Sequence, residues 1–113
     1  MRRDPLLHLD DIQKAIARIK GYTAPMDYNA FVNDERTQDA VIRNLEVIGE
    51  AARALPAEIK AKTVSIEWPR IIALRNLLIH EYFGVSLRII WDVVTTKLDT
   101  LDAACVTLRG ENL

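Results

Sequence analysis

The stretch from Ser86 to Leu108 reads SLRIIWDVVTTKLDTLDAACVTL and decides the fold class of this chain. Its apolar residues alternate steps of four and three for three heptads, at Leu87, Trp91, Val94, Leu98, Leu101, Cys105 and Leu108. Such steps keep side chains on one side of an α-helix, which turns once every 3.6 residues or so. This regularity is typical of a helix that packs at a shallow angle in a bundle. We therefore expect one long helix here, capped by Ser86.

Three more long helices are expected upstream, because start and stop signals flank segments with helical spacing of apolar residues. Asp4-Pro5 combines an N-cap with a proline at the first helical position. The expected helices run from Pro5 to near Tyr22, from Asn33 or Asp34 to Pro56, and from Glu67 to His80 or Phe83, with short helices around Tyr28 and between Pro56 and Ala61. The sequence therefore predicts an all-α fold, an antiparallel bundle of four to five helices.

Gly49 lies in the middle of the second long helix, whose apolar stripe is Val41, Leu45, Ile48, Ala52 and Leu55. A glycine inside a helix costs about 1 kcal/mol relative to alanine. We expect the compensation to be the close approach of another helix, for which the missing Cβ leaves room.

Length and composition suit one domain that covers residues 1–113. The net charge of −1 argues against broad, non-specific binding to nucleic acid, although it leaves room for a local phosphate site. The lone Cys105 rules out an intrachain disulfide and has the spacing of a small core residue. No apolar run is long enough for a transmembrane span, and the N-terminal residues do not resemble a signal peptide. We expect a cytoplasmic protein without a membrane partner.

The segment from Arg75 to Tyr82, RNLLIHEY, places polar groups of useful chemistry within a mostly apolar helix. On a helical wheel the apolar residues around it form two faces, one with Ile71, Leu74 and Leu78 and the other with Ile72 and Ile79. Arg75 lies between the two faces, and Asn76 and His80 lie just beyond the second. One face can bury in the bundle core. The other needs a cover, for which a second subunit is the natural candidate.

Arg75, Asn76 and His80 are the candidate catalytic residues. Arginine keeps its charge and matches phosphate oxygens, and histidine can act as general acid or base. Together they suffice for RNA cleavage without a metal, since the base takes the 2′-hydroxyl proton and the arginine stabilises charge on the phosphoryl oxygens. A symmetric dimer would bring two His80 side chains into one cleft. The alternative is an interface or core-rim role, because R-N-x-x-x-H is a short pattern.

The other polar residues have simpler interpretations. His8 is expected at the surface or the core rim, and the two histidines show no metal-ligand spacing, so we predict neither metal nor cofactor. Trp68 and Trp91 are expected as core or interface anchors.

A charged stripe follows the second long helix at Arg43, Glu46, Glu50 and Arg53. The default interpretation is a solvated face whose members pair with one another. The functional alternative is that Glu46 or Glu50 reaches across to orient Arg75.

Four segments together carry a resemblance to a known family. The stretch Arg75–Tyr82 has the pattern R-x4-H-x-Y, which is the first and central motif. Thr37–Ala51 resembles the family's second helix, and Trp68–Ile72 resembles the segment that leads into the motif. His80–Val85 and Ile90-Trp91 resemble the segment that follows the motif. On these segments the chain resembles the HepT-like family of the HEPN superfamily over nearly its whole length.

The resemblance implies a HEPN-like homodimer that acts as the toxin of a type VII toxin–antitoxin pair, a metal-independent ribonuclease on tRNA or mRNA rather than DNA. By position, Arg75 and His80 would be the catalytic pair and Asn76 the polar residue after the arginine. Tyr82 matches the tyrosine to which the antitoxin, a minimal nucleotidyltransferase, transfers AMP from ATP. AMP there would place negative charge where RNA phosphate should bind.

A second interpretation is a helical partner module without catalytic activity. It would dock a nucleotidyltransferase and help to hold its nucleotide. The second apolar face and the lack of a basic surface motivate this alternative.

Overall fold

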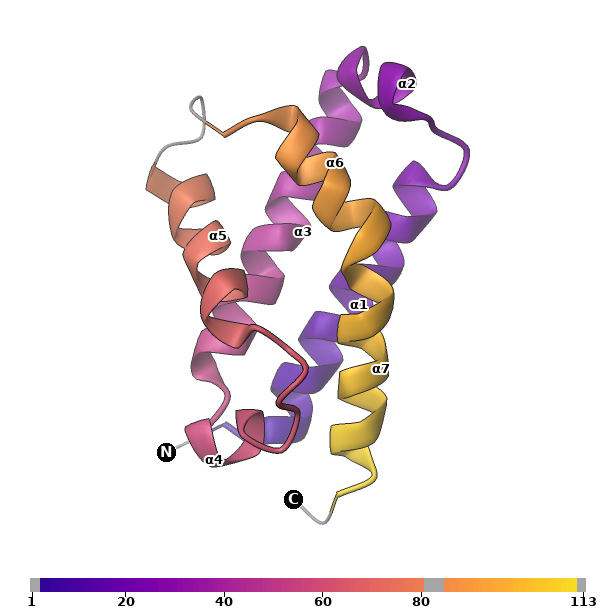
Figure 1. The fold of residues 1–113 in the computed structure, drawn as a ribbon. Helices are drawn as coiled ribbons and strands as arrows, with labels where there is room; N and C mark the ends of the chain where they lie inside the picture. The colour runs from indigo at the N-terminus through magenta and orange to yellow at the C-terminus, as the bar shows by residue number, and fades with distance from the viewer. Residues whose placement is uncertain (1–2, 81–84, 112–113) are drawn as a thin grey trace.

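A computed structural model of the chain describes residues 3–80 and 85–111. Within these ranges every regular element is a helix, so the predicted all-α fold is confirmed (Figure 1). The helices are α1 (Pro5–Thr23), α2 (Tyr28–Val32), α3 (Glu35–Ala54), α4 (Ala57–Lys60), α5 (Trp68–His80), α6 (Leu87–Thr96) and α7 (Leu98–Arg109). Their bounds agree closely with the predicted starts and stops, apart from the last predicted helix.

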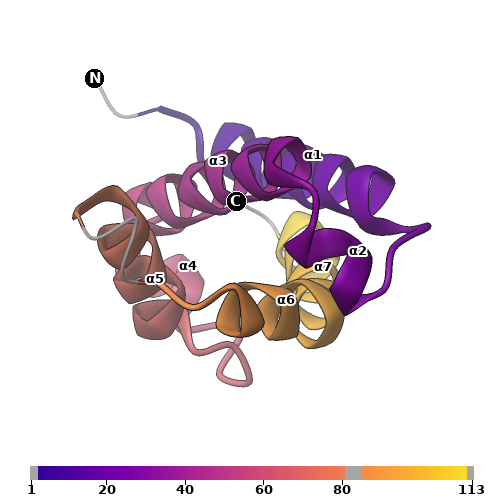
Figure 2. The same ribbon diagram turned by 90° about the horizontal axis from the view of Figure 1, so that it is seen from above.

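The long helices run alongside one another, with α3 between α1 and α5 (Figure 2). The α6–α7 pair completes the bundle, where α7 packs against α1 and α6 contacts α2. The short helices α2 and α4 lie at opposite ends of the bundle (Figure 1). In the described ranges no helix is both long enough and apolar enough to cross a membrane. Because α3 contacts both α1 and α5, it is the central element that sets the position of α5 relative to the rest.

Side-chain caps fix where the helices begin. Asp4, Asp27 and Asp34 accept backbone hydrogen bonds at the starts of α1, α2 and α3, and Ser86 does the same for α6. Asp34, rather than Asn33, therefore caps α3. The backbone N–H of Thr37 donates to the Asp34 carboxylate at 3.0 Å, and this bond holds the pKa of Asp34 below its usual value.

The predicted apolar stripes form the core. Buried residues include Leu9, Ile12, Ile16 and Ile19 of α1, Val41, Leu45, Ile48 and Ala52 of α3, and Leu98, Leu101, Cys105 and Leu108 of α7. Burial raises the pKa of the Cys105 thiol to about 12, as expected for a thiol enclosed by apolar neighbours. The prediction of Cys105 as a small core residue is confirmed.

The prediction of one uninterrupted helix from Leu87 to Leu108 is wrong, because the chain forms two helices that meet at Lys97. Lys97 departs from ideal helix geometry at φ −112°. Just before it, the Thr95 and Thr96 hydroxyls donate to the carbonyls of Trp91 and Asp92, at 2.9 and 2.5 Å. Threonine hydroxyls bonded back in this way bend helices. The apolar spacing continues across the bend, which is why the sequence pattern did not reveal it.

Gly49 confirms the expected close approach of a second helix, which is α5. A Cβ added at Gly49 would clash with the Arg75 Cβ and would lie 2.7 Å from the Arg75 Cγ and 3.3 Å from the Ile71 carbonyl oxygen. The aliphatic stem of Arg75 therefore occupies the space that any other residue at position 49 would fill.

We predict that Gly49→Ala lowers the free energy of unfolding by about 1–3 kcal/mol, because the new methyl group forces α3 and α5 apart. The measurement is urea unfolding followed by far-ultraviolet circular dichroism. Gly21→Ala is the matched control, since a Cβ there meets no atom within 4 Å and alanine favours the helix. Equal stability of the two variants would contradict the tight contact.

Candidate functional site

The start of α5 fixes the position of the candidate catalytic helix. Trp68 is buried, and its indole Nε1–H donates to the Thr63 hydroxyl at 3.0 Å. The predicted role of Trp68 as a core anchor is confirmed. Two helical turns further along, Arg75 meets Gly49, so α5 is held against the bundle at both points.

The Arg75 guanidinium is held by two acceptors. Its Nη2 lies 2.6 Å from the Glu50 carboxylate, and its Nη1 donates to Asn76 Oδ1 at 2.9 Å. The Arg75 side chain is 18% exposed, whereas that of Glu50 is 58% exposed. The Nε of Arg75 is buried and has no partner among the described residues. The guanidinium is thus fixed in orientation, with unused hydrogen-bonding capacity.

The charged stripe on α3 differs from the default prediction that its members pair with one another. Within the described residues, no ion pair joins its members to one another; Glu50 instead pairs with Arg75 on α5. The alternative, in which a glutamate of this stripe reaches across to Arg75, is confirmed for Glu50.

His80 lies at the last described position of α5 and is exposed. Within the described part of the chain, no hydrogen bond joins His80 to Arg75 or Asn76, and the Asn76 oxygen is engaged by Arg75 instead. Tyr82, the predicted modification site, lies outside the described residues.

The two predicted apolar faces of α5 differ in how well the chain covers them. On the first face Leu78 is buried, while Ile71 and Leu74 are half-buried. On the second face Ile72 is half-buried and Ile79 is 43% exposed. Among the described residues, the second face is therefore only partly covered.

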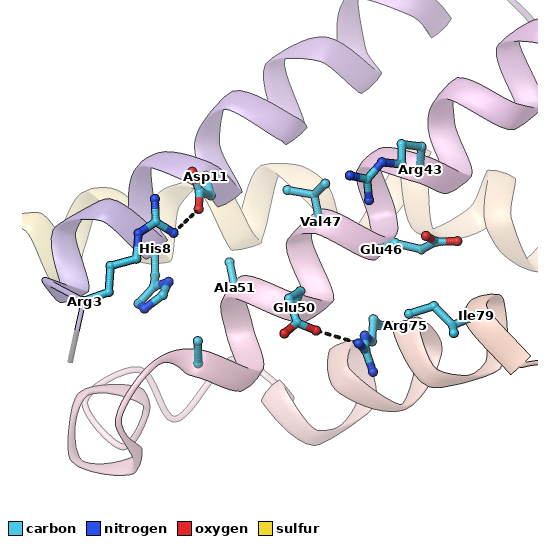
Figure 3. Close-up of a pocket in the computed structure, with 11 residues that line it drawn as sticks. Arg3, His8, Asp11, Arg43, Glu46, Val47, Glu50, Ala51, Arg75 and Ile79 are labelled. Atoms are coloured by element: carbon cyan, nitrogen blue, oxygen red, sulfur yellow. Dashed lines mark hydrogen bonds and ion pairs between the residues drawn. The ribbon is translucent and has the colours of Figure 1, made fainter. Parts of the chain in front are cut away.

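A groove of about 460 Å³ opens beside Arg75, between α1, α3 and α5 (Figure 3). Its walls include Arg3, His8 and Asp11 from α1 and the residues just before it, Arg43, Glu46, Val47, Glu50, Ala51 and Ala54 from α3, and Arg75 and Ile79 from α5. His8, which is expected at the surface or the core rim, is half-buried and lies in the same groove as Arg75. No sequence signal connects the two residues, since 67 positions separate them. Among the described residues, no group of three His, Cys, Asp or Glu side chains could hold a metal ion.

We predict that the Arg75–Glu50 pair contributes more coupling energy than an exposed pair at the start of α5. A double-mutant cycle with Arg75→Gln and Glu50→Gln should give about 0.5–1 kcal/mol by urea unfolding, because Arg75 is largely shielded from water. The control cycle uses Arg70 and Glu67, which pair at 2.7 Å with both side chains exposed, and should give about 0.2–0.5 kcal/mol. A coupling no larger than that of the control would count against a fixed guanidinium.

Comparison with known proteins places the chain in a family. Residues 12–108 match the family model described as Ribonuclease HepT-like. The chain is 38% identical over 109 residues to a protein of Thermococcus cleftensis named “Probable ribonuclease HepT”, covering 96% of this chain and 99% of that protein. It is 41% identical over 97 residues to a Methanocaldococcus jannaschii protein named “Putative RNase”, covering 86% and 80% of the two chains. No solved structure matches. The chain belongs to the Ribonuclease HepT-like family.

Proposed function

We propose that this protein is a metal-independent ribonuclease in which Arg75 and His80 carry the reaction. The observation that carries the proposal is the fixed guanidinium of Arg75, held by Glu50 and Asn76 on the helix that ends in an exposed imidazole. Family membership supports the same activity, since relatives carry the name of ribonucleases.

Arg75 is suited to stabilising charge on a phosphoryl oxygen. A preorganised cation costs no reorganisation when negative charge develops, which makes a fixed guanidinium more effective than a mobile one. Each terminal amino group of the guanidinium has one further N–H beyond its bond to Glu50 or Asn76, and these are the donors that a phosphate could use. Glu50 lowers the net charge of the site but keeps the guanidinium plane in one orientation, so its role is positioning.

His80 is suited to the proton transfers. As general base it would take the 2′-hydroxyl proton, the 2′-oxygen would attack the adjacent phosphorus, and the 5′-oxygen of the next nucleotide would leave with a proton from an acid. The reaction yields a 2′,3′-cyclic phosphate and a 5′-hydroxyl, and it needs no metal.

A second copy of the chain would complete the site. Arg75 and His80 are five residues apart on α5, which separates them by about 140° around the helix and about 7.5 Å along it. They therefore do not point to one spot within a chain. A two-fold axis beside Ile79 would cover the exposed apolar face and bring together the His80 side chains of both subunits, one as base and one as acid.

We predict that His80→Ala lowers the rate of RNA cleavage about 10²–10⁴-fold and that Arg75→Gln lowers it about 10²–10³-fold. The measurement is cleavage of a radiolabelled tRNA pool and an mRNA by purified protein in the presence of EDTA. Arg70→Gln is the control, because Arg70 lies on the same helix and forms an ion pair with the exposed Glu67 rather than with a residue of the proposed site.

Intact RNA after incubation with the wild type would contradict a ribonuclease and favour the partner module without catalytic activity. Equal rates for the wild type and the His80→Ala variant would remove His80 from the mechanism but leave the activity standing.

We further propose that the protein is the toxin of a toxin–antitoxin pair and that AMP transfer to Tyr82 by a minimal nucleotidyltransferase neutralises it. Tyr82 follows His80 by two positions in the sequence, so an added AMP would bring a phosphate charge close to the proposed RNA phosphate site. Repulsion between the two phosphates would oppose substrate binding.

We predict that co-expression with such a nucleotidyltransferase adds the mass of AMP to the protein, measured by intact-mass spectrometry, and relieves growth arrest. Tyr82→Phe should abolish the mass gain and the relief. Tyr22→Phe is the control, since Tyr22 is exposed on α1. A mass gain that persists in Tyr82→Phe would place the modification elsewhere.

A further inference from the structure

The groove beside Arg75 continues away from His80 across the face of α3. Arg75 and Ile79 form one wall, and His8, Arg3 and Asp11 form the other (Figure 3). Its volume of about 460 Å³ lies within the range of roughly 300–1,000 Å³ that is typical of small-ligand sites. Because Arg75 belongs both to this groove and to the proposed catalytic pair, whatever occupies the groove would adjoin the scissile phosphate.

The charges in the groove are partly neutralised by one another. Asp11 pairs with Arg3 at 2.7 Å, and Glu50 pairs with Arg75 at 2.6 Å. Among the described residues, Arg43 forms neither an ion pair nor a side-chain hydrogen bond, and it is exposed at the groove edge (Figure 3). Arg43 is therefore the groove arginine that no carboxylate of the described residues neutralises, and its planar fork fits a phosphate well.

The floor of the groove is apolar and is formed by short side chains. These belong to Val47, which is half-buried, and to Ala51, which is buried. Small side chains leave room for a flat ring, and the His8 imidazole on the opposite wall is a surface on which a base can stack. Glu46, next to this floor, has no ion-pair partner among the described residues and can accept a hydrogen bond from a base amino group.

We propose that this groove binds the nucleotide adjoining the scissile phosphate of a single-stranded RNA, with Arg43 contacting a backbone phosphate and the base lying over Val47 and Ala51. This proposal rests on the proposed ribonuclease activity. It assigns a binding site to the nucleotide next to the phosphate on which the catalytic pair acts. Three arginines and three carboxylates balance in the groove, so it suits one base and one phosphate rather than a run of phosphates. An unpaired segment is favoured because a base in a duplex would first have to break its pairing and stacking to reach the floor.

The test measures binding of fluorescein-labelled 2′-O-methyl oligo(A), oligo(C) and oligo(U) by anisotropy over a series of salt concentrations. The 2′-O-methyl group blocks attack by the 2′-oxygen, so binding is measured without cleavage. Arg43→Gln should weaken binding of all three probes about tenfold and should reduce the slope of log affinity against log salt by about 0.7, the value for one phosphate contact on a single strand. The melting temperature of the variant should stay at that of the wild type, since Arg43 has no partner to lose among the described residues.

Arg53→Gln is the matched control, because Arg53 is an exposed arginine of the same helix and of the same charge but does not line the groove. It should leave both affinity and salt slope unchanged. If Arg43→Gln and Arg53→Gln behave alike while the wild type cleaves RNA, the groove assignment is wrong and the ribonuclease stands. If the wild type neither binds the probes nor cleaves RNA, both proposals fail.

Glu46→Gln provides a second readout, because it changes base contacts without removing a phosphate contact. It should lower the ratio of the affinity for oligo(C) to that for oligo(U) about fivefold, since the carboxylate can only accept, as from the cytosine amino group, whereas the glutamine amide can also donate to the uracil O4. An unchanged ratio would exclude Glu46 from base recognition.

Discussion

The contact between Gly49 and Arg75 is the constraint on which the rest of the site depends. Helix α3 is central to the bundle, and its distance from α5 at this point is set by the absence of a Cβ at position 49. Hydrophobic burial alone would allow a range of separations between two such helices, because apolar contacts are not directional. The stem of Arg75, seated against bare backbone, selects one of them.

The same contact also determines the chemistry. Once the aliphatic part of Arg75 lies against Gly49, its guanidinium emerges at the edge of α3, where the next residue in the chain, Glu50, offers a carboxylate at 2.6 Å. The steric residue and the charge partner are therefore neighbours in the sequence. A shift of α5 by a fraction of a helical turn would break the ion pair and move the guanidinium away from the groove. Packing against Gly49 and pairing with Glu50 thus act on one side chain and together hold it in one position.

Much of the fold could be predicted because its determinants are local. Capping side chains such as Asp4 and Ser86 mark helix starts by bonding backbone groups a few residues away, and such signals are visible in sequence. Apolar spacing does not predict the bend at Lys97, because threonine hydroxyls can point either to solvent or back to the helix.

The sequence also predicts part of the candidate site but not all of it. The segment from Arg75 to His80 could be recognised as chemically unusual, and Gly49 indicated a close approach without identifying its partner. The groove could not be predicted, because its walls come from three helices that meet only through tertiary packing. Sequence spacing relates side chains within about two turns of one helix, and it does not show which helices pack together.

Charge balance bears on how such a protein could select its substrate. Affinity for nucleic acid usually rises with the number of phosphates that a basic surface neutralises, and a chain of net charge −1 with a balanced groove can neutralise few. Discrimination must then come from contacts that do not depend on total charge, namely base stacking, hydrogen bonds to base edges and the shape of an unpaired segment. Such contacts are short-ranged and lose little strength in salt. A ribonuclease that holds RNA in this way would leave most duplex RNA untouched and would act where a single strand can enter the groove beside Arg75.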